Sequence, residues 1–70
     1  MIARNVLEEI RTGLRGKTGD KVTITLSTGQ CAFCFSGRDA ATRTADALSN
    51  QPVAITGVEQ VTQDTYCFIA

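Results

Sequence analysis

The segment Cys31-Ala-Phe-Cys34 holds the first residues of this sequence whose type and spacing could do chemistry. Two cysteines at this spacing are typical of structural zinc sites and of thiol–disulfide redox sites. A structural zinc ion takes four ligands, whereas the chain has three cysteines and no histidine. A redox pair usually begins a helix, but this pair lies inside a predicted strand, where residues three apart point to opposite faces. We therefore expect no metal site and no cofactor, and interpret the thiols as small packing groups.

The third cysteine, Cys67, makes the cysteine count odd. The first turns carry Arg4, Glu8 and Glu9, which is not the pattern of a secretory signal. No apolar run approaches the length of a membrane span. These observations predict reduced thiols, no disulfide framework, no membrane contact and a cytoplasmic location.

Ser36, Gly37 and Arg38 connect a predicted strand to a predicted helix and form a candidate anion-binding site. Free backbone N–H groups at such a junction, together with a hydroxyl and a guanidinium, could hold a phosphate or a carboxylate. The same residues also fit plain helix capping, because Ser36 precedes Asp39 by the spacing of a capping box. We favour capping, and a small anionic nucleotide is the ligand that the other interpretation would take.

Arg4, Arg11 and Arg15 follow one face of the predicted N-terminal helix and are candidate partner-binding residues, as is Tyr66 in the last predicted strand. The arginines could contact an acidic protein surface or a nucleic acid. They also fit a solvated helix face paired with Glu8, which is the interpretation we favour. The chain has seven Lys and Arg against seven Asp and Glu, so nucleic acid, which is bound by neutralising phosphates, is the less favoured partner.

Catalytic equipment is scarce in this sequence. Without histidine, a nucleophile would have to be a serine or cysteine activated by a lysine or a carboxylate, and no spacing indicates such a pair. A chain of 70 residues also scarcely encloses a substrate pocket. We therefore predict that the protein is not an enzyme and has no catalytic residues.

Five segments show the periodicity of regular structure. They are a helix over residues 2–14, strands over 21–26 and 31–35, an alanine-rich helix over 39–50, and a strand-rich segment over 53–70. Gly13 should weaken the end of the first helix, and Gly16 should terminate it in a left-handed conformation. In the last segment we expect a turn at residues 62–64 and a bulge at Gly57, which would keep Val53, Ile55 and Val58 on one face.

The assembled prediction is one compact α+β domain over residues 1–70. Its elements follow in αββαββ order and form a four-stranded, mainly antiparallel sheet with two helices on one face. The last strand is apolar on both sides, with Tyr66 and Phe68 alternating with Cys67 and Ile69. The second face of the sheet should therefore be covered as well, and a partner or a second copy of the chain is the expected cover.

These observations favour a small binding or inhibitor protein that acts by occupying the surface of a partner protein. We expect it to be a dimer or larger homo-oligomer, because a chain of this size has a small core and oligomerisation adds buried surface. Phages and mobile elements encode many small proteins of this kind that act against host defence machinery. We therefore expect such a role on general grounds, although no motif in the sequence indicates it. The alternatives are an oligomeric protein that sequesters a small anionic nucleotide at Ser36, Gly37 and Arg38, and a nucleic-acid accessory protein that uses the arginines of the first helix.

Overall fold

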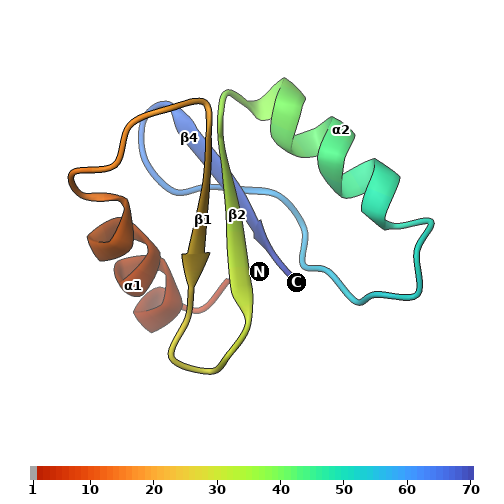
Figure 1. Cartoon of the computed structure of the whole chain (residues 1–70), viewed down its shortest axis with the longest axis horizontal. Helices are drawn as coiled ribbons and strands as arrows, with labels where there is room; N and C mark the ends of the chain where they lie inside the picture. Colours follow the sequence, from red (N-terminus) through yellow and green to blue (C-terminus); the bar gives the residue numbers. More distant parts are fainter. Residues whose placement is uncertain (1) are drawn as a thin grey trace.

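The computed structural model describes residues 2–70 and shows an α+β fold with two helices and a four-stranded antiparallel sheet (Figure 1). The elements are α1 (Arg4–Leu14), β1 (Lys21–Thr25), β2 (Cys31–Ser36), α2 (Arg38–Leu48), β3 (Glu59–Gln60) and β4 (Thr65–Ile69). The predicted fold class and the antiparallel sheet are confirmed.

The strands lie in the order β1-β2-β4-β3, so β1 and β3 are the two edges of the sheet. A tight turn joins β1 to β2, in which the Leu26 N–H donates to the carbonyl of Gln30 at 2.8 Å. Gly29 in this turn has a φ of 92°, a conformation that a side chain would strain. The register places Val22 opposite Cys34, and Cys34 opposite Cys67. These three side chains therefore share one face of the sheet.

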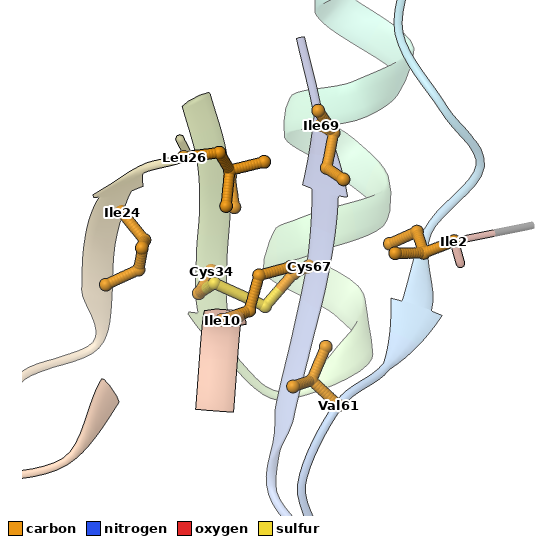
Figure 2. Close-up of a cluster of buried hydrophobic side chains, with 9 residues drawn as sticks. Ile2, Ile10, Ile24, Leu26, Cys34, Val61, Cys67 and Ile69 are labelled. Carbon is orange, nitrogen blue, oxygen red and sulfur yellow. A yellow bond between two sulfur atoms is a disulfide. The ribbon is translucent and has the colours of Figure 1, made fainter. Parts of the chain in front are cut away.

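Helix α1 covers this face. The apolar side of this amphipathic helix faces the sheet. Its residue Ile10 is fully buried there and belongs to the same cluster as Ile24 and Cys34 (Figure 2). The other buried members of this cluster are Ile2, Leu26, Ala32, Val61, Cys67 and Ile69. Glu9 fixes the helix to the β1–β2 turn, because its carboxylate accepts hydrogen bonds from both the N–H and the hydroxyl of Ser27.

Helix α2 covers the opposite face. Phe33 and Phe35 of β2 alternate with the residues of the first cluster and pack against Phe68 of β4, with ring centroids 5.6 Å and 6.0 Å from that of Phe68. The helix presents Ala41 and Ala45, whose small side chains let it approach β2 and β4 closely.

The prediction that both helices lie on one face is wrong. The first cluster joins α1 to one side of the sheet and the second joins α2 to the other, so the molecule has three layers with the sheet in the middle (Figure 1). Strands that are apolar on both faces are thus covered by the chain's own helices. The covered faces remove one ground for the predicted homo-oligomer, an uncovered side of the sheet, and leave the other, the small size of the chain.

Gly13 has a packing role that the sequence did not reveal. A Cβ atom at this position would lie 2.8 Å from Cγ2 of Ile24 on β1. The absent side chain therefore lets the end of α1 rest directly on the sheet, which explains a glycine inside a helix where it costs helix propensity. Gly16 follows with a φ of 75°, which confirms the predicted left-handed residue at the end of this helix.

The segment between α2 and β4 forms less strand than predicted. Residues 53–58 have no regular structure, and β3 has only two residues. Ile55 and Val58 pack in the cluster beneath α2, as expected, but Val53 is exposed, so the prediction that all three share one face is wrong. The Thr56 hydroxyl replaces a strand partner here, because it accepts a hydrogen bond from the Ile69 N–H at 2.9 Å.

Candidate functional site

Cys34 and Cys67 form a disulfide across β2 and β4. Their Cα atoms are 4.2 Å apart, as in a pair of directly opposed residues that exchange no backbone hydrogen bonds. The prediction of reduced thiols is therefore wrong for these two residues. Sequence spacing indicated Cys31 and Cys34 as the possible pair, whereas the register that brings Cys67 opposite Cys34 depends on the fold.

Cys31 is the free cysteine of this chain and is half-buried. It lies at the start of β2 opposite Thr25, on the face that carries Phe33, and thus on the other side of the sheet from the disulfide. The expected separation of the two cysteines to opposite faces is confirmed. Among residues 2–70, no group of three or more metal-ligating side chains lies close enough to hold a metal ion.

The structure uses the backbone of the candidate anion site for other contacts. The Ser36 N–H donates to the carbonyl of Asp20, and the Gly37 N–H donates to the carbonyl of Asp64. The N-cap residue of α2 is Gly37, with no side-chain cap, so the prediction that Ser36 caps this helix is wrong. The Ser36 and Gly37 N–H groups are thus engaged within the fold, whereas the side chains of Ser36 and Arg38 are exposed.

Arg38 and Tyr66 lie together at the start of α2. The Arg38 guanidinium carbon is 5.2 Å from the centroid of the Tyr66 ring, a cation–π contact. Tyr66 is half-buried and belongs to the cluster under α2. The two predicted sites, one for an anion and one for a partner, therefore meet in a single contact.

The arginines of α1 do not act alike. The Arg11 Nε donates to the carbonyl of Val61 at 2.9 Å, and its guanidinium forms an ion pair with Glu8 at 2.8 Å. Arg11 thus ties α1 to the chain that follows β3. All three arginines are exposed, but within residues 2–70 no hydrogen bond or ion pair holds the side chain of Arg4 or Arg15.

The outer edge of β1 is a site that sequence reasoning missed. Backbone bonds between Leu26 and Gln30, and between Ser36 and Asp20, show that the even-numbered residues of β1 pair with β2. The N–H and C=O groups of Lys21, Thr23 and Thr25 therefore point away from the sheet. Within residues 2–70, no backbone group bonds to these three residues.

An open groove of about 480 Å³ runs beside this edge, on the side of the sheet that α2 covers. It exists because α2 packs on β2 and β4 and leaves β1 uncovered on that face. Phe35 lines the groove, which carries Lys21 on the β1 side and Arg43 on the α2 side. The other lining residues are Asp20, Ser36, Ala40 and Thr44.

Comparisons with protein-family models, with curated proteins and with solved structures find no match to this chain. No helix within residues 2–70 has the length and apolar character needed to cross a membrane.

Proposed function

We propose that this chain is a small binding protein that docks on a partner protein by pairing its β1 edge with an extended segment of the partner. The observation that carries this proposal is the row of outward N–H and C=O groups at Lys21, Thr23 and Thr25. Such an edge is a template for a further strand, and strand addition is a common mode of peptide recognition.

The two edges of the sheet differ in what they offer a partner. At the other edge, β3 extends over Glu59 and Gln60 only, whereas β1 has five residues. Natural proteins protect their sheet edges with very short strands, bulges or several charged residues. β3 fits this description, and β1 has only Lys21 as a charged residue. β1 is therefore the edge that favours docking.

The proposal keeps the function expected from the sequence, a non-enzymatic protein that occupies its partner's surface. Such an inhibitor would pair with an extended segment of its partner and so prevent that segment from binding another strand or tail within the partner's own assembly. A phage or mobile-element protein directed against host defence machinery is one setting for such an inhibitor. The cytoplasm stays the proposed location, although it would keep Cys34 and Cys67 reduced. Docking at β1 uses neither sulfur.

A peptide selection tests this function and does not require the natural partner. A random library of short linear peptides is panned against the protein. Binding of each enriched peptide is then measured from the fluorine NMR signal of a trifluoromethyl tag on Cys31. This residue begins β2 and lies opposite Thr25 of β1. We expect enriched peptides to lose at least about tenfold in affinity against Thr23→Pro, because proline removes the central outward N–H.

The matched control is Thr23→Val, which keeps the N–H and the strand preference and should bind as the wild type does. Circular dichroism establishes that Thr23→Pro folds; if it does not, Thr25→Pro at the end of the strand replaces it. A library that yields no binder, or binders indifferent to both prolines, overturns the proposal. A mass of twice 7.5 kDa in light scattering, abolished by Thr23→Pro, would instead assign the edge to a second copy of the chain.

A further inference from the structure

We infer that the segment accepted by β1 is acidic, with an Asp or Glu side chain received between Lys21 and Arg43. This inference rests on the proposed function, since it concerns the chemistry of the strand that docks at the same edge. It commits to one kind of partner, an extended peptide segment of a protein.

The register of an added strand brings one of its side chains to the groove. Residues directly opposite each other on neighbouring strands share a face and approach within about 5.5 Å between Cβ atoms. The side chains of Lys21, Thr23 and Thr25 lie on the α2 side, because these residues pair with Phe35, Phe33 and Cys31. The partner residue opposite Lys21 therefore projects toward Arg43 across the groove.

The charge around this position is positive. Neither Lys21 nor Arg43 has an ion pair within residues 2–70; Arg43 makes a single hydrogen bond, at 3.5 Å, to the backbone carbonyl of Asp39. The carboxylate that lines the groove is Asp20, so two cations face one acid. A carboxylate that enters completes this set, whereas a lysine would meet two like charges.

The groove also offers an apolar surface for the methylene groups of an acidic side chain. Phe35 is 5% exposed and forms an apolar wall with Ala40, against which methylene groups can pack. The cations stand on opposite sides, one on β1 and one on α2. Main-chain pairing along β1 accepts any sequence, so this pocket for one side chain supplies the specificity.

The test repeats the peptide selection with a charge-reversed protein. Against the wild type, enriched peptides should carry Asp or Glu at one position of their aligned sequences, and changing that residue to Asn or Gln should weaken binding by about threefold to tenfold, as two partly exposed ion pairs allow. Against Lys21→Glu combined with Arg43→Glu, the selection should turn to peptides with Lys or Arg at that position.

The matched control combines Arg4→Glu with Arg15→Glu, which changes the net charge equally at exposed positions, one at each end of α1. This variant should keep the acidic preference. If peptides bind at β1 but carry no acidic preference, or if the preference follows Arg4 and Arg15, the inference is wrong while the docking function stands. If no peptide binds at β1, both fail. Inorganic phosphate and ADP are tested as free anions. If either one shifts the signal of the Cys31 tag and displaces the peptides at equal concentration, the inference is wrong and the site binds a free anion.

Discussion

Cys34 and Cys67 oppose each other at the centre of the sheet, and their disulfide lies beneath Ile10 of α1 (Figure 2). The bond joins residues 33 positions apart in sequence and so closes a loop that includes α2 and β3. It joins the neighbouring strands β2 and β4 within the hydrophobic cluster against which α1 packs. Where the bond is formed, it adds to the stability that so small a core gains from packing.

Reduction of this disulfide should lower the free energy of unfolding by about 3–4 kcal/mol, because the closed loop restricts the unfolded chain. Urea unfolding of oxidised and reduced protein measures the difference. Cys31→Ser, which leaves the disulfide intact, should match the wild type in both states. A thiol assay in denaturant should find one free thiol without reductant and three with it. Three thiols without reductant would contradict the disulfide.

Gly13→Ala should destabilise the protein although alanine is the better helix former. The added Cβ would approach the Ile24 methyl to 2.8 Å, and relieving that contact costs about 1–3 kcal/mol, against a gain of up to about 1 kcal/mol in helix propensity. Thr12→Ala, at an exposed position of the same helix, should be neutral or slightly stabilising. Thermal unfolding of the two variants decides; an increase in Tm for Gly13→Ala contradicts the packing.

Thr56→Val should cost about 1–3 kcal/mol, because it leaves the partly buried Ile69 N–H without its acceptor while the shape of the side chain is kept. Thr42→Val makes the same change at an exposed position of α2 and should have little effect. Chemical denaturation measures both. Equal stability of the two variants would mean that Thr56 does not hold the end of β4.

Arg11→Met should destabilise the protein by about 1 kcal/mol through loss of the hydrogen bond to Val61, whereas Arg15→Met should be neutral. The pair separates two roles within the arginine stripe that the sequence grouped as one. Unfolding curves of both variants test the distinction. A neutral Arg11→Met would return this residue to the candidate partner-binding surface.

Local patterns predicted most of the regular structure. The alternation of Val22, Ile24 and Leu26 marks β1, and the spacing of apolar residues up to Leu14 marks α1, because both depend on neighbours in sequence. The C-terminal hairpin was harder, since a hydroxyl of Thr56 rather than a strand pair satisfies the Ile69 N–H. No periodicity signals that replacement.

Relationships between residues far apart in the chain could not be predicted from the sequence. The face that α2 covers depends on how the chain leaves β2 at Gly37, whose φ of 96° no sequence periodicity predicts. The Cys34–Cys67 pair and the contact between Gly13 and Ile24 follow from register and layer order. The docking edge was missed for the same reason, because an edge strand is defined only once the strand order is known.

Amide hydrogen exchange with a selected peptide tests the central proposal most directly. The N–H groups of Val22 and Ile24 already bond to β2, and those of Lys21, Thr23 and Thr25 point outward. We predict that a saturating peptide slows exchange at the three outward amides by at least about tenfold, as new strand hydrogen bonds should. Slowed exchange on α1 or at Glu59 and Gln60, with Lys21, Thr23 and Thr25 unchanged, would contradict docking at β1.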